Sequence, residues 1–266
     1  MTTSDLAVQR LRHPIKARLL QVERITPLTP RLMRISLSGD DLSDFISSSF
    51  DDHIKVFIPR DGATVMPQAG PNGLTFPDDA QRPMARDYTP RRYDTVNKQL
   101  DIEFVLHNDG PATEWARQAK TGDQLVIAGP RGSFVIPDGF DWQIMIGDET
   151  ALPAMARRLE ELPAGAKVQV IAEVENKAEE LVFETRADVS VTWLHRENGT
   201  RSLEEAARAI SLPAGEGYVW AAAESLAVRA IYKHFVTDLG LDKSRIRASS
   251  YWKRGAIATH EVLDGA

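Results

Sequence analysis

The chain has 266 residues, of which 42% are hydrophobic and 26% charged, a composition typical of one large or two ordinary globular domains. It contains no cysteine, which excludes disulfides, thiolate zinc sites, cysteine nucleophiles and cysteine-ligated iron–sulfur clusters, so any redox chemistry requires a bound cofactor. The net charge of −6 argues against general affinity for nucleic acid. The sequence contains no run of eighteen apolar residues, the length needed to cross a membrane, and its first residues lack the apolar segment of an export signal. We therefore expect a cytoplasmic protein.

The first half of the chain predicts short strands separated by turns, a pattern that favours an antiparallel β-barrel of Greek-key type. A segment rich in Gly and Pro, residues 60–85, predicts a loop or a loose hairpin. The strands are expected at 16–26, 31–39, 53–59, 100–107 and 123–130.

The second half alternates short apolar runs with helical periodicity, which predicts a parallel sheet covered on both faces. Ser202, followed three residues later by Glu205, predicts a capping box, and Gly240 is expected to end the last helix. The strands are expected at 142–147, 167–174, 190–196, 217–223 and 244–252, and the helices at 148–162, 202–212 and 224–240. We therefore expect a barrel domain at 1–137 followed by an α/β nucleotide-binding domain at 138–266.

Residues 86–89 read Arg-Asp-Tyr-Thr and carry the residue types that could bind a flat ring joined to a phosphate. The planar guanidinium of Arg86 suits phosphate oxygens, and Tyr88 offers a flat apolar face. Pro90 biases Thr89 toward an extended conformation, which helps to fix its hydroxyl. On its own, this four-residue motif is equally compatible with an arginine-rich edge strand.

The segment HNDGPATEWA, residues 107–116, predicts a helix that starts at a tight turn. Gly110 permits the turn, Pro111 suits the first helical position, and the free N–H groups of Ala112 and Thr113 would attract an anion. A capped surface helix is the alternative reading of this turn. In either reading, we expect Trp115 to anchor the helix to the core.

The order of a barrel and then a nucleotide fold, with R-x-Y-T in the barrel, resembles the ferredoxin–NADP reductase superfamily. Together with RDYTPRRYD, the segments DDHIKVFIP (51–59), LHNDGPATEWA (106–116) and YWKRG (251–255) resemble the siderophore-interacting protein family. The members of this family are flavin-dependent ferric-siderophore reductases of the vibriobactin-utilisation type. The resemblance extends from about residue 16 to about residue 262.

The resemblance implies an FAD site in the barrel. Arg86 is expected to bind the flavin phosphates, Tyr88 to stack on the isoalloxazine ring, and the hydroxyl of Thr89 to lie near flavin N5. The turn before the helix would lie on the flavin phosphates. The other residues implied in FAD binding are Val105, His107, Pro111, Ala112, Thr113 and Gly132.

The resemblance also places a pyridine nucleotide at the turn IGDETALPAM (146–155), although the usual G-x-G-x-x-P pattern lacks one glycine there and has gained two carboxylates. Arg196 is expected to favour NADPH over NADH by binding a 2′-phosphate, whereas Glu173 and Glu175 would favour NADH. Arg196 can equally be read as a solvated loop charge, and Glu224 as a capping residue. The residues expected to bind NAD(P)H are Gly147, Asp148, Thr150, Arg196, Ala222 and Glu224.

The substrate implied is a ferric siderophore, expected to be anionic and of catecholate type, held by Lys55, Arg247, Lys253 and Arg254, with the last three in a carboxyl-terminal segment of the second domain. Each of these cations alone is also compatible with an ordinary surface charge. Reducing equivalents would pass from NAD(P)H through FAD to Fe(III), with no acid–base residue and no protein metal ligand required. We expect a monomer. The alternatives are a general flavin or protein-acceptor reductase and a non-catalytic siderophore carrier.

Overall fold

The computed structural model describes residues 6–60, 62–70, 73–78, 82–106, 110–199, 201–255 and 261–264. The chain divides into two compact units. Residues 9–135 form one, which we call the barrel unit, and residues 136–266 together with 1–8 form the other, the α/β unit. The chain therefore passes from one unit to the other twice, immediately before β1 (Gln9–Arg12) and immediately after β11 (Gly132–Val135), two strands that pair antiparallel.

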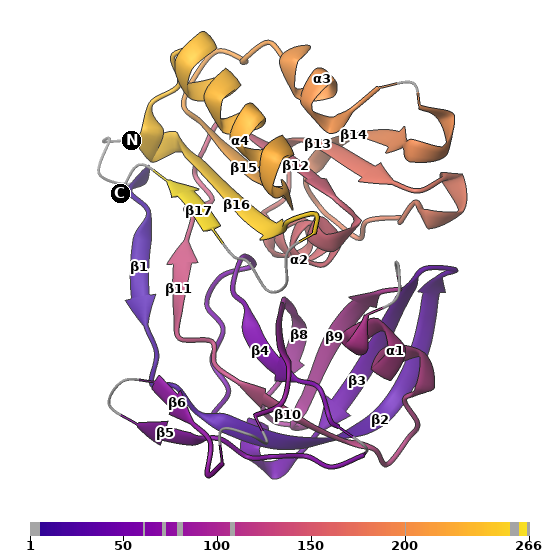
Figure 1. Ribbon diagram of the computed structural model, residues 1–266. Helices are drawn as coiled ribbons and strands as arrows, with labels where there is room; N and C mark the ends of the chain where they lie inside the picture. Colours follow the sequence, from indigo (N-terminus) through magenta and orange to yellow (C-terminus); the bar gives the residue numbers. More distant parts are fainter. Residues whose placement is uncertain are drawn as a thin grey trace. The chain divides into compact units, whose positions relative to one another are not determined.

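The barrel unit contains a seven-stranded antiparallel sheet in the order β7-β4-β10-β2-β3-β9-β8 (Figure 1). Its two edge strands are separated along the chain by Thr89 alone, so the sheet has to curl until its edges meet. This geometry confirms the predicted barrel. The strands are β2 (Ala17–Thr29), β3 (Leu32–Ser38), β4 (Ile54–Phe57), β7 (Ala85–Tyr88), β8 (Pro90–Asp94), β9 (Gln99–Val105) and β10 (Gln124–Ala128).

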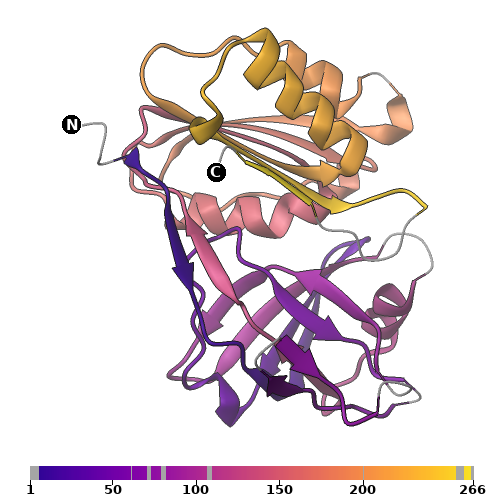
Figure 2. The ribbon, with the colours of Figure 1, turned by 60° about the vertical axis from the view of Figure 1, so that its left-hand side comes forward.

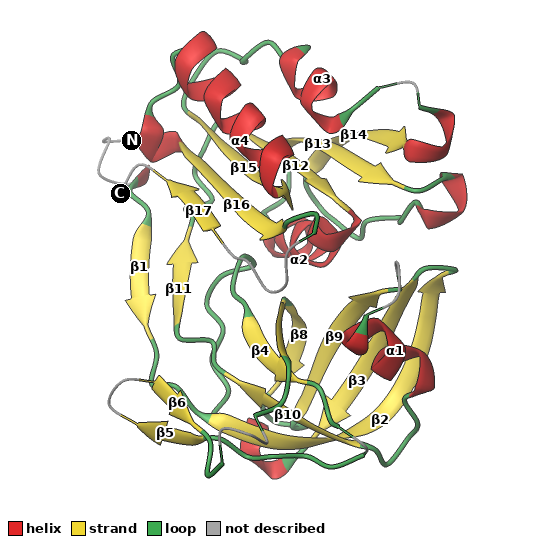
Figure 3. Cartoon of the chain, viewed as in Figure 1, coloured by secondary structure: helices red, strands yellow, loops and turns green. Residues whose placement is uncertain are grey.

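The concave face of this sheet is filled by aliphatic and aromatic side chains that alternate along the strands, among them the fully buried Ile35, Ile54, Ile102 and Phe104. Figure 3 shows that the unit consists mainly of strands, with the α-helix α1 (Pro111–Gln118) beside β9 and a short 3-10 helix at Asp40–Leu42. The segment predicted as a loose hairpin contains the short pair β5 (Gln68–Gly70) and β6 (Gly73–Thr75).

The α/β unit contains a six-stranded sheet in the order β14-β13-β12-β15-β16-β17. The first five strands run parallel, as predicted, but β17 pairs antiparallel with β16, so the sheet is mixed. The four residues of β17 are too few for periodicity to predict them. The strands are β12 (Trp142–Asp148), β13 (Lys167–Val174), β14 (Asp188–His195), β15 (Gly217–Glu224), β16 (Ile246–Trp252) and β17 (Glu261–Asp264).

Helices cover both faces of this sheet: α3 and α4 lie over one face and α2 lies on the other (Figures 1 and 2). The predicted capping box is present, because the Glu205 amide donates to Ser202 Oγ at 3.1 Å and the Ser202 amide donates to Glu205 Oε2 at 2.8 Å. The helices are α2 (Leu152–Glu161), α3 (Leu203–Arg208) and α4 (Ser225–Lys233).

The last helix, α4, continues as a five-residue π-helix, His234–Asp238, and the chain then turns at Gly240 with φ +71°. In the part of the chain that the structure describes, no helix is both long and apolar enough to cross a membrane.

Candidate functional site

The R-x-Y-T stretch forms β7, and its pairing with β4 decides which way each side chain points. Tyr88 lies opposite Ile54, and Arg86 lies opposite Val56. Since Ile54 and Val56 are fully buried in the barrel core, Arg86 and Tyr88 project from that same face of the strand pair. The motif residues expected to contact a ring and its phosphate therefore share one face.

Lys55 lies on the opposite face of the same strand pair. It is opposite Asp87, and its Nζ donates to Asp87 Oδ1 at 2.8 Å with about half of the Lys55 side chain exposed (49%). The structure thus separates Lys55 from Arg86 and Tyr88 by the thickness of the sheet and pairs its charge with a carboxylate. The sequence expectation took no account of Asp87 as its partner.

Three aromatic rings connect the R-x-Y-T strand to the helix that follows β9. The centroids of Tyr88 and Phe104 lie 4.4 Å apart, and those of Phe104 and Trp115 lie 5.5 Å apart. Trp115 packs against the barrel core, as expected of an anchor. Burial raises the pKa of Tyr88, although the charge of Arg86 acts in the opposite direction, so the phenol is neutral at physiological pH.

Polar groups near this aromatic row have few partners. Arg86 donates to the neighbouring Ala85 carbonyl at 2.8 Å and to Met84 Sδ at 3.5 Å, and it forms no ion pair with any described carboxylate. Thr89 is buried, yet its hydroxyl makes no hydrogen bond to a residue that the structure describes. A guanidinium and a hydroxyl with spare hydrogen-bonding capacity beside an aromatic face fit the phosphate and ring of a flavin.

The start of α1 offers free backbone donors beside the same row of rings. Gly110 is the N-cap with extended backbone, Pro111 has no N–H, and the Glu114 amide makes the first helical hydrogen bond, to the Gly110 carbonyl at 2.8 Å. The N–H groups of Ala112 and Thr113 precede that bond, so both are available to an anion.

Val105, also expected to bind FAD, is the last residue of β9. Thr113 Oγ1 donates to the carbonyl of Val105 at a long 3.5 Å, which links the start of the helix to the strand end. His107 lies outside the described residues.

Gly132 has a structural reason to be glycine. A Cβ at this position would lie 2.5 Å from the carbonyl oxygen of Leu11, which belongs to the paired strand β1. The close approach of β1 to β11 therefore accounts for this glycine without a flavin contact.

A buried ionic cluster behind Thr89 was not anticipated. Glu103, fully buried on β9, accepts from Arg34 Nε at 3.0 Å, and its Oε1 lies 3.5 Å from Nε of Arg91, a buried residue two positions after Thr89. The sequence signal was Arg91, the first arginine of TPRRYD. The cluster joins the start of β8, next to Thr89, to strands β3 and β9.

In the α/β unit, Gly147 lies where β12 meets the following helix. A Cβ there would lie 2.5 Å from the Ala222 carbonyl oxygen on β15 and 2.5 Å from Ala151 Cβ. Glycine and alanine at these positions therefore allow the helix start and the neighbouring strand to approach closely, the role that small residues have in nucleotide-binding turns.

The next residue, Asp148, is almost fully buried (3% exposed) and accepts four hydrogen bonds. Its Oδ1 accepts from the Thr150 amide at 2.9 Å and from the Thr150 hydroxyl. Its Oδ2 accepts from the Glu224 amide at 3.2 Å and from Trp252 Nε1 at 2.7 Å. Burial, and then the charge of Glu149, raise the pKa of Asp148 from 3.8 to about 6.

These contacts correct the expected role of this turn. The carboxylate of Asp148 already occupies the donors of Thr150 that would otherwise hold a phosphate, so the turn carries its own anion. Glu224 also acts as a cap, since its side chain accepts from the Leu226 amide at 2.6 Å at the start of α4.

Arg196 is surrounded by carboxylates. Its guanidinium donates to both oxygens of Glu149, at 2.7 and 2.5 Å, and to Glu173 at 3.4 Å, and its Nε lies 3.6 Å from Glu175. Burial alone would lower the pKa of Arg196, but these hydrogen bonds and charges outweigh burial and raise it. Arg196 is therefore engaged by carboxylates of the protein, and a 2′-phosphate would have to compete with them.

The carboxyl-terminal cations lie at different places. Lys253 and Arg254 directly follow β16, are exposed, and form no ion pair with any residue in the described ranges. Arg247 lies six residues before Lys253, near the other end of β16, about 20 Å away at the rise of an extended chain. Lys253 and Arg254 therefore lie together at the end of β16, whereas Arg247 lies apart from them, and a shared role in binding a siderophore stays a prediction.

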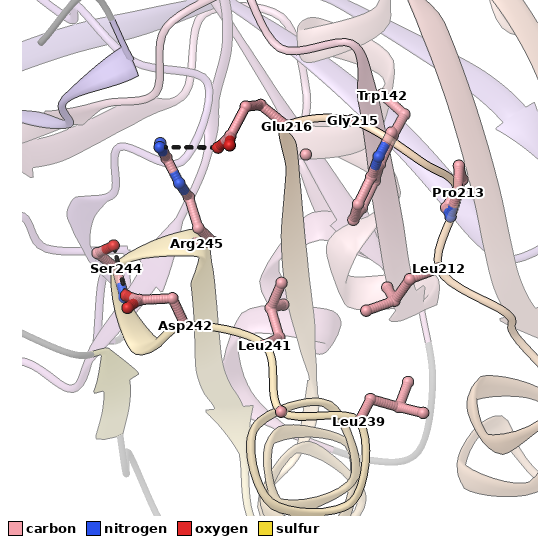
Figure 4. Close-up of a pocket in the computed structure, with 12 residues that line it drawn as sticks. Trp142, Leu212, Pro213, Gly215, Glu216, Leu239, Leu241, Asp242, Ser244 and Arg245 are labelled. Carbon is pink, nitrogen blue, oxygen red and sulfur yellow. Dashed lines mark hydrogen bonds and ion pairs between the residues drawn. The ribbon is translucent and has the colours of Figure 1, made fainter. Parts of the chain in front are cut away.

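A cavity of about 440 Å³ lies at the amino ends of β12 and β15 (Figure 4). Its Glu216 and Arg245 form an ion pair at 3.0 Å, and Asp242 accepts hydrogen bonds from Ser244. Ligands of parallel α/β sheets bind beyond the carboxyl ends of the strands, so this cavity is at the wrong edge for a nucleotide.

The profile of the siderophore-interacting FAD-binding domain matches residues 21–134, and that of the siderophore-interacting protein matches residues 140–255. The chain is 34% identical over 248 residues to the NADPH-dependent ferric-chelate reductase of Escherichia coli (strain K12), covering 92% of this chain and 96% of that protein. It is 32% identical over 245 residues to ferric vibriobactin reductase ViuB of Vibrio cholerae, covering 90% of each.

Among solved structures, a siderophore utilization protein from T. fusca has a TM-score of 0.86 at 36% identity, covering 94% of this chain and 97% of that one. SipS, a siderophore-interacting protein from Aeromonas hydrophila, has a TM-score of 0.75 at 30% identity, covering 92% and 93%. Both the sequence and the fold therefore agree over nearly the whole length. The chain belongs to the siderophore-interacting protein family.

Proposed function

We propose that this protein is an NADPH-dependent flavoprotein that reduces Fe(III) held in a siderophore and so releases iron as Fe(II). The FAD-binding and siderophore-interacting profiles support this function, as do relatives named for the reduction of ferric chelates, ferric vibriobactin and ferric acinetobactin. The observation that carries the proposal is the row of Tyr88, Phe104 and Trp115, with Arg86 on the same strand face as Tyr88 and with Trp115 in the helix whose first amides are free.

The residues of the barrel unit would hold FAD in the following way. Arg86 and the amides of Ala112 and Thr113 bind the phosphates, because a guanidinium and a helix N-terminus both favour anions. Tyr88 packs against the ring system, and the Thr89 hydroxyl is placed to hydrogen-bond at its edge. Bound FAD supplies the conversion between the two-electron chemistry of NADPH and the one-electron reduction of iron.

The α/β unit would bind NADPH at the carboxyl ends of β12 and β15, where the small residues Gly147 and Ala222 allow a nucleotide to approach the backbone closely. The phosphates are not held by Thr150 or Arg196, because both already bond to carboxylates of the protein. The carboxyl ends of β12 and β15 would orient the nicotinamide ring, and residues other than Thr150 and Arg196 would contact the phosphates.

Lys253 and Arg254 supply positive charge for an anionic siderophore of catecholate type. Their charges have no described carboxylate partner, and the net charge of the chain is −6, so the pair stands out against an acidic background. Alanine substitution of either should raise KM severalfold for an anionic ferric chelate and leave KM for a neutral one unchanged. Lys243→Ala, an equal loss of charge before the start of β16, is the matched control.

We also propose that the active form is a monomer of 29.5 kDa acting in the cytoplasm. Light scattering of the FAD-loaded protein should report that mass, and cell fractionation should recover the reductase activity in the cytoplasmic fraction.

The function is tested by flavin content and stopped-flow oxidation. The purified protein should be yellow with one FAD per chain, and NADPH should bleach it. The reduced protein should then be reoxidised faster by ferric catecholates than by free flavin, quinone or ferricyanide. Preference for free flavin or a protein acceptor would indicate a general reductase, and a colourless protein that binds ferric siderophore would indicate a carrier.

A further inference from the structure

Trp252 is the last residue of β16, and it is held although it is exposed. About a third of the residue is accessible (36%), an unusual position for a tryptophan. Its indole Nε1 nevertheless donates to Asp148 Oδ2 at 2.7 Å, the short distance of a charge-assisted hydrogen bond. A second bond follows two residues later, where the Arg254 amide donates to Glu224 Oε1 at 3.2 Å. The segment 252–254 is thus attached at two points.

Asp148 connects this segment to the rest of the α/β unit. It ends β12, it accepts from the Glu224 amide at the end of β15, and it accepts from Trp252 at the end of β16. One buried carboxylate therefore joins the carboxyl ends of three neighbouring parallel strands. The phosphate-binding role expected for Asp148 does not explain these contacts, because a carboxylate repels phosphate.

We propose that Asp148 is a positioning residue: through the indole of Trp252 it fixes segment 252–254, and thereby the side chains of Lys253 and Arg254, beyond the carboxyl ends of β12 and β15. The significance of those two cations rests on the proposed function. The attachment itself follows from the contacts alone.

The surroundings of Asp148 make this attachment sensitive to pH. Glu149, Glu173 and Glu224 are the nearby carboxylates, and Arg196 is the nearby cation. Because burial raises the pKa of Asp148 to about 6, the group is ionised at neutral pH and becomes protonated in mildly acidic solution. Protonation weakens the bond from Trp252, since a neutral acceptor replaces a charged one.

The attachment is tested first without any activity measurement. Trypsin cleaves after Lys253 and Arg254, so the rate of appearance of peptides that end there, measured by mass spectrometry at pH 7.5, reports how firmly the segment is held. Trp252→Phe keeps an aromatic ring but removes the donor, and Asp148→Asn removes the charge. Cleavage should be about tenfold faster in both, as expected from the loss of a charge-assisted hydrogen bond.

The control is Trp193→Phe, which alters a tryptophan that stacks on Phe183 at 5.7 Å on the edge strand β14. Its cleavage rate at Lys253 and Arg254 should match that of the wild type. If Trp252→Phe were cleaved no faster than this control, the proposal would be wrong. Because the side chain of Trp252 is exposed, this variant is expected to fold even if Asp148→Asn does not.

The second test uses ferricyanide, an anionic acceptor whose charge is constant between pH 5 and 8. In the wild type, KM for ferricyanide should rise severalfold as the pH falls through about 6, with kcat nearly constant. In Asp148→Asn, KM should be high and independent of pH, and the double variant with Trp252→Phe should be no worse than either single one. A pH profile in Asp148→Asn identical to that of the wild type would overturn the positioning role. If the wild type reduced no acceptor, the proposed function would fail, and the trypsin result would still decide the attachment.

Discussion

At the scale of the residue, a cluster of carboxylates at the carboxyl edge of the parallel sheet is neutralised only in part by the protein's own cation. Asp148, Glu149, Glu173 and Glu175 surround one guanidinium, that of Arg196. The sequence placed these residues at the correct edge, because strand ends follow from apolar runs. It could not predict the pairing, because residues from β12, β13 and β14 meet only after the sheet has formed.

Asp148 should make stability depend on pH in an unusual direction. Its pKa is raised by burial from 3.8 to about 6, so the folded protein binds this proton more tightly than the unfolded chain does. The contribution favours folding below about pH 4 and is lost as pH rises to about 6, a difference of about 3 kcal/mol at 1.36 kcal/mol per pKa unit.

Urea unfolding of the wild type and of Asp148→Asn at pH 4.5 and pH 7 measures this term. The stability of the wild type relative to the variant should fall by about 2 kcal/mol between the two pH values. A constant difference would show that Asp148 has an ordinary pKa.

Arg196→Ala should lower stability and leave the choice of nucleotide unchanged. The variant leaves Glu149 and Glu173 without their cation, and we expect a loss of about 1–3 kcal/mol because the site is only partly buried. The ratio of kcat/KM for NADPH and NADH should change by less than about threefold.

Arg208→Ala, which removes an exposed i,i+4 pair with Glu204, is the control and should cost less than about 0.5 kcal/mol. A tenfold or greater loss for NADPH alone in Arg196→Ala would instead assign the 2′-phosphate to Arg196.

At the scale of the element, local sequence signals were sufficient where the structure is local. Alternating apolar residues predicted the long strands of the barrel, and the spacing of Ser202 and Glu205 predicted the start of α3. The signals were insufficient where pairing is distant. The strands β1 and β17 are four residues long and pair with β11 and β16, so their sequences carry no periodicity of their own.

The same limit applied to the site. The R-x-Y-T strand and the start of α1 could be predicted as contiguous motifs. That Lys55 pairs with Asp87, on the face of the sheet opposite to Tyr88, depended on the register of β4 with β7. A shift of one residue in register would have reversed the result.

Gly147→Ala should disrupt the joint between β12, β15 and the start of α2. The added Cβ would lie 2.5 Å from a backbone oxygen, which cannot move as a flexible side chain does. We expect a loss of about 1–3 kcal/mol or more in urea unfolding. Gly110→Ser, where a Cβ meets no atom within 4 Å, should leave stability unchanged or slightly higher; equal losses would contradict the packing argument.

At the scale of the whole molecule, each unit has its own hydrophobic core. The barrel unit is filled from β2, β3, β4, β9 and β10, and the α/β unit from its central strands with α3 and α4. Ligands bound by different units should therefore stabilise different parts of the protein.

Calorimetry with added ligands tests this division. FAD at a hundred times its Kd should stabilise the barrel unit by about 2.7 kcal/mol and raise the transition of that unit, while NADPH should raise the other. Arg86→Ala should abolish the FAD shift and leave the NADPH shift intact. A single transition moved equally by both ligands would argue against independent units.

The sheet order has a consequence for how the chain is made. Strand β10 pairs with both β2 and β4, so it joins two halves of the sheet that share no other strand pairing in the described residues. Until the ribosome has released residue 128, a growing polypeptide has two partial sheets with open edges on β2 and β4, and these edges can pair with other nascent chains. Slow translation before residue 124 would prolong this exposure and should increase pairing between nascent chains.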